Sequence, residues 1–371
     1  MVERTSPPRR PTLDPASAAV RRAVRDCLAA VPETPAGVAG GPTPADGMTP
    51  AGGPTAASGM TDTSGAPGFA VPGLIVAVSG GADSMALLHA CAFLHRRGEI
   101  RAGAVTVDHG LQAETAEVAH RVAATAESWG MPAEVVPVDI SESDEGLEAA
   151  ARNARYTALE ATRTRAGADW ILTAHTRSDQ AETVLLGLMR GSGTRSLAGM
   201  SMCTGRLLRP LLGLDREQTE AACRAQGIEV WHDPMNDDTA YARVRTRRLL
   251  AGLETELGQP VGANLARTAD LCRADADFLD ARADQVSAHL RGLASVPIDD
   301  FAQLEDAILS RVLRDWVLSL GVPAQNLGAA RVAELARLIR SRSRGRLSLP
   351  GDTEVVIGRD RVVFQPAAKA R

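Results

Sequence analysis

Residues 74–88 read LIVAVSGGADSMALL, and this stretch decides the fold. Its first five residues, Leu74–Val78, are all apolar and are typical of a buried β-strand. Two adjacent glycines, Gly80 and Gly81, then permit a tight turn that brings backbone N–H groups against an anion. A helix that starts near Asp83 adds the partial positive charge of its N-terminus. The stretch therefore predicts a strand, a phosphate-binding turn and a helix.

The turn does not fit the phosphate loop of the P-loop hydrolases, which needs a lysine after its glycines. The only lysine of the chain is Lys369, far away in the sequence. The hexamer SGGADS instead resembles the PP-loop of the ATP pyrophosphatases, which cleave ATP between its α and β phosphates and leave AMP on a substrate oxygen. An ordinary strand-turn-helix is the alternative, because glycine-rich turns are common where helices begin. The resemblance implies that ATP is bound by Ser79, Gly80, Gly81, Ala82, Asp83 and Ser84.

Apolar strands and helical stretches alternate after this motif, and this pattern predicts an α/β fold with a doubly wound parallel sheet. The strand candidates are Leu74–Val78, Ala104–Asp108, Ala133–Val138 and Trp170–Ala174. Polar residues directly follow three of them, namely Ser79, Asp108 with His109, and His175. Ligands of such sheets bind at the carboxyl ends of the strands, so one site is expected to collect all three.

The rest of the chain divides by composition. Residues 1–31 predict a short helix, with Asp14 as its N-cap and Pro15 in its first turn. Residues 32–70 are so rich in Gly, Pro and Ala that they are interpreted as a disordered insertion. Residues 71–250 are expected to form the catalytic domain and 251–296 a helical connection whose leucines and Phe278 have helical spacing. Residues 297–371 predict a small α+β domain with strands at Arg346–Leu349, Glu354–Ile357 and Arg361–Phe364.

Charge and cysteine usage exclude several classes of protein. A net charge of −4 gives no global basic field, so any contact with nucleic acid has to be local. The five cysteines include no CxxC pair, which argues against a disulfide framework and against a zinc or iron–sulfur site. No long apolar segment supports secretion or membrane spanning, so a cytoplasmic location is expected.

A further motif, AHTRSDQAETVLL, begins at Ala174. His175 follows the strand, and Asp179 and Glu182 lie three residues apart at the start of the next helix, on neighbouring faces. This arrangement predicts an acidic surface opposite the phosphate loop that binds a cation. The alternative is that both acids only complement the helix dipole, a frequent role of acids in first turns.

Further motifs follow in a fixed order: RGSGTR at 190–195, LAGM at 197–200, RPLL at 209–212, DPMND at 233–237 and YARVRTRR at 241–248. With the preceding motifs they resemble the tRNA(Ile)-lysidine synthetase family, which reads SGGxDS, DHGLR, AHxxDDxxET, RGSGxxGLxGM, RPLL, DPSN and a segment like YxRNxIR. The similarity spans residues 74–250 in seven successive motifs.

The resemblance implies a ligase that uses ATP and Mg²⁺. ATP adenylates the 2-carbonyl oxygen of the wobble cytidine of a CAU-anticodon tRNA(Ile), and the ε-amino group of free lysine displaces AMP to give lysidine, so that decoding changes from AUG to AUA. The implied catalytic residues are Asp83, Asp179, His175 and Arg243, with Asp83 also as a magnesium ligand. Asp108 and His109 are expected at the adenosine, and the substrate-binding residues are Glu182, Arg190 and Arg247. A homodimer is left open.

Three positions depart from the family pattern. Ser178 stands where the family has the first of two aspartates, which puts a metal role of that position in doubt. Gln112 replaces an arginine and Val244 replaces an asparagine. None of these departures removes the phosphate loop or Asp179, so the expected activity stands.

Residues 331–371 hold ten basic and four acidic residues, a local net charge of +6. This favours contacts with tRNA phosphates over a merely solvated face. Three other functions are weighed. A tRNA thiolase shares the PP-loop but needs thiol chemistry, and a non-catalytic ATP sensor would not need the acids Asp83 and Asp179. An amidotransferase would need a glutaminase domain, for which the chain before Leu74 leaves no room.

Overall fold

The computed structural model describes residues 14–31, 73–110, 113–139, 147–233, 235 and 238–367. The interpreted insertion at 32–70 lies outside these residues, as do Gln112 and Lys369. The chain forms two compact units. The described residues up to 192 and from 199 to 269 belong to the first unit, and those at 193–198 and from 270 onward belong to the second.

The first unit is built on a six-stranded sheet of order β3-β2-β1-β4-β6-β5. Its strands are β1 Gly73–Ala77, β2 Arg101–Asp108, β3 Ala133–Pro137, β4 Trp170–Leu172, β5 Cys203–Thr204 and β6 Leu207–Leu208. All neighbouring strands run parallel except β5, which is antiparallel to β6. Inside the sheet, Val76 of β1 lies opposite Ala104 of β2 on one side and Leu172 of β4 on the other. The predicted parallel sheet is confirmed.

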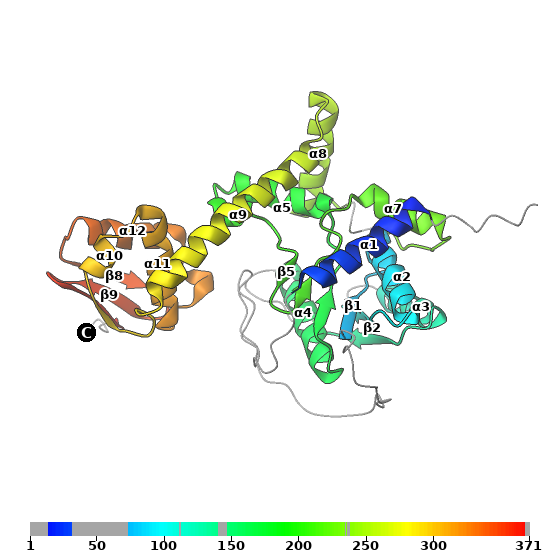
Figure 1. The fold of residues 1–371 in the computed structure, drawn as a ribbon, viewed down its shortest axis with the longest axis horizontal. Helices are drawn as coiled ribbons and strands as arrows, with labels where there is room; N and C mark the ends of the chain where they lie inside the picture. Colours follow the sequence, from blue (N-terminus) through cyan, green and yellow to red (C-terminus); the bar gives the residue numbers. More distant parts are fainter. Residues whose placement is uncertain are drawn as a thin grey trace, which may run out of the picture. The chain divides into compact units, whose positions relative to one another are not determined.

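Helices α2 Ala82–Arg96, α3 Ala113–Ser128 and α4 Leu147–Arg165 pack directly on the strands of this sheet. The other main helices of the first unit are α1 Pro15–Ala30, α5 Arg177–Met189, α7 Arg216–Ala225 and α8 Ala242–Leu257, of which α1 and α7 pack on α2 and α8 packs on α5. Successive residues of a strand point to opposite faces. Accordingly, Val76 is buried in a core that it shares with Val20 of α1 and Leu87 of α2, whereas Ile75 packs in a separate core with Leu159 of α4. Figure 1 shows α1, α2 and α7 side by side on one face.

Local sequence signals account for most element boundaries. Helix α1 begins where predicted, because a carboxylate oxygen of Asp14 accepts a hydrogen bond from the Ser17 N–H at 2.8 Å. Strand β4 ends at Leu172, two residues before the predicted end. The two-residue strands β5 and β6 were not predicted, because pairs this short carry no periodic pattern.

The second unit contains an antiparallel sheet of order β7-β10-β9-β8. Its elements are α6 Thr194–Leu197, β7 Ser295–Pro297, α10 Asp299–Ala302, α11 Asp306–Ser319, the 3₁₀ turn η2 Ala324–Asn326, α12 Ala329–Arg340, β8 Gly345–Leu349, β9 Thr353–Ile357 and β10 Arg361–Pro366. Its core surrounds Trp316, which is fully buried, lies 5.2 Å between ring centroids from Phe301, and donates its indole N–H to the Leu293 carbonyl at 2.9 Å. The predicted small α+β domain is therefore present, with β8, β9 and β10 at the three predicted strands.

The two units are divided inside helix α9, Val261–Ser287, within the predicted helical connection. The apolar spacing of that connection does not lead to complete burial, since Leu257, Leu271 and Phe278 are exposed. Among the described residues, none of the helices combines the length and the apolar character needed to cross a membrane.

Candidate active site

The loop between β1 and α2 has the geometry that a bound phosphate needs. Gly80 has a φ of 89°, and a Cβ at this position would lie 3.1 Å from the Val118 side chain, so only glycine fits. At Gly81 a Cβ would meet only the Ser79 hydroxyl, at 3.9 Å, which leaves the loop open on this side. Helix α2 begins without a side-chain cap, so its first N–H groups are left for an anion.

Two serines stabilise this loop. The Ser84 hydroxyl accepts a hydrogen bond from the Ser79 N–H at 3.2 Å and donates one to the Gly81 carbonyl at 2.9 Å. Ser84 is buried, whereas Ser79 is exposed and can face a ligand. The Ser79 hydroxyl also donates a hydrogen bond to the Ser84 hydroxyl, at 3.3 Å, so Ser84 fixes both the turn and the exposed Ser79 side chain.

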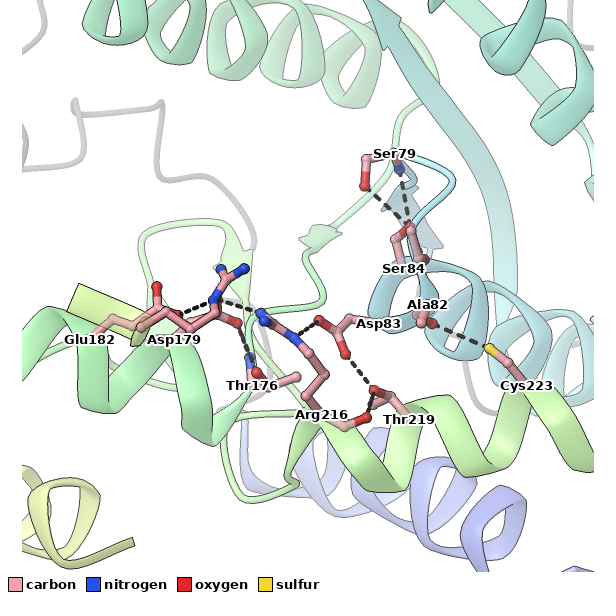
Figure 2. Close-up of polar contacts among 12 residues, drawn as sticks. Ser79, Ala82, Asp83, Ser84, Thr176, Asp179, Glu182, Arg216, Thr219 and Cys223 are labelled. Carbon is pink, nitrogen blue, oxygen red and sulfur yellow. Dashed lines mark hydrogen bonds and ion pairs between the residues drawn. The ribbon is translucent and has the colours of Figure 1, made fainter. Parts of the chain in front are cut away.

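Asp83 points from the first turn of α2 toward helix α7 (Figure 2). One carboxylate oxygen accepts a hydrogen bond from the Thr219 hydroxyl, and the other lies 3.4 Å from Nε of Arg216. Burial raises the pKa of the Asp83 carboxyl, and the Thr219 hydrogen bond and the Arg216 charge oppose that rise only in part. A carboxylate with a raised pKa is a better proton acceptor than an ordinary one.

Asp179 lies on the other side of Arg216 (Figure 2). Its Oδ2 accepts hydrogen bonds from the N–H and the hydroxyl of Thr176, both at 2.8 Å, and its Oδ1 lies 3.5 Å from Nη2 of Arg216. Burial by itself raises the pKa of Asp179, but the Thr176 N–H and the Arg216 charge outweigh it and the pKa is lowered. Asp179 therefore stays ionised and offers a fixed negative charge.

Glu182, one turn along α5, is almost fully buried and pairs with Arg247 of α8. Its Oε1 accepts a hydrogen bond from Nε of Arg247 at 2.8 Å. Burial raises the pKa of Glu182, and Arg247 opposes that rise. The two residues predicted to bind substrate thus bind each other.

His175 is near one acid, Asp179, and three arginines. Its Nδ1 is 2.9 Å from the Thr173 hydroxyl. Burial lowers the pKa of His175 to about 4, and the nearby charges of Arg209, Arg152 and Arg243 contribute to the same shift. The imidazole is therefore neutral near pH 7, and positive charge surrounds the place where His175 is expected to meet a phosphoryl group.

The Asp108–His109 turn is held by its neighbours. One oxygen of Asp108 accepts hydrogen bonds from the Gly110 N–H and from the Thr115 hydroxyl, both at 3.0 Å. His109 Nε2 lies 3.2 Å from Nε of Arg155, while its buried Nδ1 has no hydrogen-bond partner in the described part of the chain. A buried ring nitrogen without a partner fits a site that a polar ligand such as adenosine completes.

Two further predicted residues, Arg243 and Arg190, have fewer contacts with the rest of the site. Arg243 lies in the first turn of α8 and is close enough to lower the pKa of Arg155 as well as that of His175. Arg190 follows α5 and is exposed, and no hydrogen bond or ion pair within the described residues connects its side chain to the acids. A cluster of three or more His, Cys, Asp or Glu side chains suited to a metal ion is not found among the residues that the structure describes.

Arg216 and Thr219 were missed by sequence reasoning. Both lie on α7, three residues apart and therefore on one face, and this helix directly follows the RPLL motif. The sequence signal was the capping pattern of Asp215 and Gln218, which predicts a helix start but not what the helix faces. Arg216 carries the countercharge for Asp179, Asp83 and Glu182, in that order of strength.

A cysteine also lies behind the phosphate loop. The Cys223 thiol donates a hydrogen bond to the Ala82 carbonyl at 3.3 Å, and burial raises its pKa to about 12. Such a thiol is almost wholly protonated near neutral pH and is a poor nucleophile. Cys223 is therefore not an activated thiol.

Comparison with protein families gives two matches. A PP-loop domain family matches residues 63–253, and the TilS substrate binding domain matches residues 297–363. The chain is 47% identical over 298 residues to the tRNA(Ile)-lysidine synthase of Thermobifida fusca (strain YX), covering 77% of this chain and 92% of that relative. It is 46% identical over 294 residues to the tRNA(Ile)-lysidine synthase of Streptomyces coelicolor, covering 77% and 83%. A solved U34-tRNA thiolase, NcsA from Methanococcus maripaludis, is 15% identical with a TM-score of 0.45, covering 54% of this chain and 73% of that one.

Proposed function

The chain belongs to the tRNA(Ile)-lysidine synthase family, and we infer from this membership that it is an ATP-dependent ligase that forms lysidine on tRNA(Ile). In this reaction the wobble cytidine of the CAU anticodon is adenylated on its 2-carbonyl oxygen, with release of pyrophosphate. The ε-amino nitrogen of lysine then forms a bond to C2, and AMP leaves. This reading is favoured over a tRNA thiolase and over an ATP sensor.

We propose that the loop from Ser79 to Ser84 holds the pyrophosphate part of ATP during the first step. The open side of Gly81 and the uncapped start of α2 support this role. Asp108 and His109 are proposed to face the adenosine, because His109 Nδ1 has no hydrogen-bond partner among the described residues. Mg²⁺, when bound, would neutralise charge on the leaving pyrophosphate, and Asp83 is the carboxylate placed to hold it, since Mg²⁺ commonly takes one or two carboxylates besides phosphate oxygens.

Two acids, Asp83 and Asp179, lie on either side of Arg216, and this arrangement supports lysine as the second substrate. A half-buried cation, Arg216, already lies between Asp83 and Asp179, so the site is suited to hold positive charge. We propose that Asp179, whose pKa is lowered, holds the ε-ammonium group of lysine. Asp83, whose pKa is raised, then accepts the proton that leaves a neutral amine for attack.

The arginines and His175 are proposed to act on the other side of the reacting bond. His175 is neutral and can donate or accept a hydrogen bond at the phosphoryl group, while Arg243 supplies positive charge next to it. Arg247, oriented by Glu182, presents its remaining N–H groups to the cytosine or to the lysine carboxylate. Arg190, exposed at the end of α5, is proposed to contact a tRNA phosphate.

The test is incorporation of radiolabelled lysine into acid-precipitable tRNA with ATP, Mg²⁺ and CAU-anticodon tRNA(Ile), with tRNA(Met) as the acceptor control. The variant Asp179→Asn keeps an oxygen that can accept the Thr176 hydrogen bonds but loses the charge, so it isolates the electrostatic role. Glu160→Gln, at an exposed acid paired with Arg163, is the matched control. Label that depends on ATP, is lost in Asp179→Asn and persists in Glu160→Gln supports the proposal. Pyrophosphate release without label would exclude lysine as the acceptor.

We further propose that the second unit positions the tRNA and that the enzyme works in the cytoplasm, where its substrates occur. Many arginines of the basic tail are already paired within this unit, as Arg340 is with Asp306, Arg342 with Asp299 and Arg346 with Glu354. Arg337, Arg344 and Arg359 are exposed and carry no such pair among the described residues, so they are the candidates for phosphate contacts. The homodimer is tested by sedimentation of the same preparation with and without tRNA.

A further inference from the structure

Arg21 of helix α1 is a buried cation that forms no ion pair with any described carboxylate. Its side chain is only 7% exposed, and its guanidinium lies over the ring of Phe93, 3.7 Å from the centroid. Within the described part of the chain, its Nε has no hydrogen-bond partner and no carboxylate pairs with it. Burial lowers the pKa of Arg21, and the neighbouring charges of Arg25 and Arg96 add to the shift. Native proteins normally pair a buried charge, so this one indicates a missing ligand.

A cavity of about 400 Å³ opens beside this guanidinium. Its lining consists of Ala18, Arg21, Arg22, Arg25, Asp26, Phe93 and Arg97. Glu99 neutralises part of this charge, because it accepts hydrogen bonds from Arg25 at 2.7 and 3.0 Å and from Arg97 at 2.7 Å. Asp26 is exposed at the rim. The four arginines of the lining still outnumber these two acids, so the cavity carries a net positive charge.

The sequence builds this cavity from two helix faces. Ala18, Arg21, Arg22 and Arg25 recur at the helical spacing of three and four residues, which places them on one face of α1. Phe93 and Arg97 are likewise four residues apart, at the C-terminal end of α2. The opposite face of α1 carries Val20, Val24 and Cys27, which are buried in the core. The hydrophobic packing of α1 therefore fixes its arginines toward the end of α2.

The cavity is separate from the phosphate loop. Phe93 lies eleven residues along α2 from Ala82, roughly 16 Å at the rise of an α-helix. The loop is at the N-terminal end of α2, whereas this cavity is at its C-terminal end. A ligand in the cavity is therefore a second ligand and not a displaced part of ATP.

We propose that this cavity is a binding site for a phosphate group, held by Arg21 with Arg22 and the rim arginines Arg25 and Arg97. A guanidinium offers a planar fork of N–H donors that matches two phosphate oxygens, and its stacking on Phe93 fixes the orientation of the fork. The phosphate group comes either from a free phosphate compound or from the backbone of the bound tRNA. Both sources present the same chemistry to Arg21.

The first arm of the test uses inorganic phosphate. It is titrated calorimetrically into the full-length enzyme saturated with α,β-methylene-ATP, which keeps the phosphate loop filled, at constant ionic strength. We expect phosphate to bind the wild type saturably. The affinity for phosphate should be at least tenfold lower in Arg21→Gln and severalfold lower in Arg97→Gln, since the Arg97 side chain is exposed. Arg121→Gln, an exposed arginine on α3, is the matched control and should bind phosphate as the wild type does.

The second arm measures tRNA affinity against salt concentration. A lost phosphodiester contact reduces the slope of log K against log salt by about one. Such a reduction in Arg21→Gln, but not in Arg121→Gln, supports the site with the tRNA backbone as its source. Saturable phosphate binding that is lost in Arg21→Gln supports it with a free phosphate compound. Phosphate binding that Arg21→Gln leaves unchanged, or no phosphate binding together with an unchanged salt slope, would overturn the proposal.

Folding of the variants is followed separately by thermal unfolding in phosphate-free buffer. A guanidinium that only packs against Phe93 would stabilise the fold without any ligand, so its loss would lower Tm there. An anion site predicts in addition that phosphate raises the Tm of the wild type and that this rise is lost in Arg21→Gln. A fall in Tm of equal size with and without phosphate contradicts the site.

Discussion

Nε of Arg216 lies 3.4 Å from Oδ2 of Asp83, a contact that joins residues 133 positions apart in the sequence. The same guanidinium lies 3.5 Å from Asp179, so one arginine balances two acids that would otherwise repel each other. In the proposed reaction, the lysine ammonium group would compete with this guanidinium for the same oxygens. Arg216 therefore influences both the charge of the site and the ionisation of Asp83.

Replacing Arg216 with Gln is expected to raise the pKa of Asp83 further, because burial and the charge of Asp179 are then less opposed. The acidic limb of the pH profile of kcat/KM for lysine should move to higher pH, and activity at pH 7 should fall at least tenfold. Arg216→Lys keeps the charge and is expected to retain most of the wild-type profile. Two superimposable profiles for wild type and Arg216→Gln would show that Arg216 has no such role.

Thr219 offers a second way to change Asp83 without touching its charge partner. Its hydroxyl hydrogen-bonds a carboxylate oxygen of Asp83, and Thr219 itself is fully buried. Thr219→Val keeps the shape but leaves the carboxylate without this donor, which should cost about 1.5–3 kcal/mol for a hydrogen bond to a charged group. Equilibrium unfolding in urea measures the loss. Thr219→Ser keeps the hydroxyl as the control, and equal loss in both variants would point to packing instead.

The sequence predicted those parts of the site that depend on local patterns. Apolar strands before Ser79, Asp108 and His175 placed three polar segments at one edge of the sheet, and the spacing of Asp179 and Glu182 placed two acids on neighbouring faces of one helix. Long-range partners could not be predicted this way. Arg216 looks like an ordinary arginine at a helix start, and only the packing of α7 against α2 brings it to Asp83. The pairing of Glu182 with Arg247, 65 positions apart, was hidden for the same reason.

His175 should make the stability of the fold depend on pH. Its pKa is about 4 in the folded chain against an ordinary value of 6.5, so the unfolded chain binds a proton that the folded chain does not. Stability is therefore present in full above pH 6.5 and is lost as the pH falls toward 4, by about 3 kcal/mol for a shift of this size. The free energy of unfolding, measured in urea, should fall less between pH 7.5 and pH 4.5 in His175→Asn than in the wild type. His232→Asn, at an exposed histidine, should behave as the wild type does.

Cys223 separates ligase chemistry from thiol chemistry at the same loop. Its thiol is buried with a pKa of about 12, and it serves only as a weak donor to Ala82. Cys223→Ala is expected to keep lysine incorporation within about threefold of the wild type, because the change removes a small buried group and no reacting atom. Lysine incorporation into tRNA(Ile) measures the effect. Loss of turnover in a variant that still folds and binds ATP would indicate a chemical role for the thiol.

Buried Glu182 and half-exposed Arg247 form the ion pair that connects α5 to α8. Arg247→Met leaves Glu182 without its countercharge and is expected to cost about 1–3 kcal/mol, less than a fully buried pair because solvent reaches the arginine, whereas Glu182→Gln combined with Arg247→Met should cost less than the sum of the single changes. Urea unfolding of the four proteins gives the coupling energy, and additive losses would contradict the pairing.

Because Glu182 positions Arg247, Glu182→Gln alone should raise the KM for a substrate more than it lowers kcat. The opposite split would mean that Glu182 itself contacts the reacting atoms.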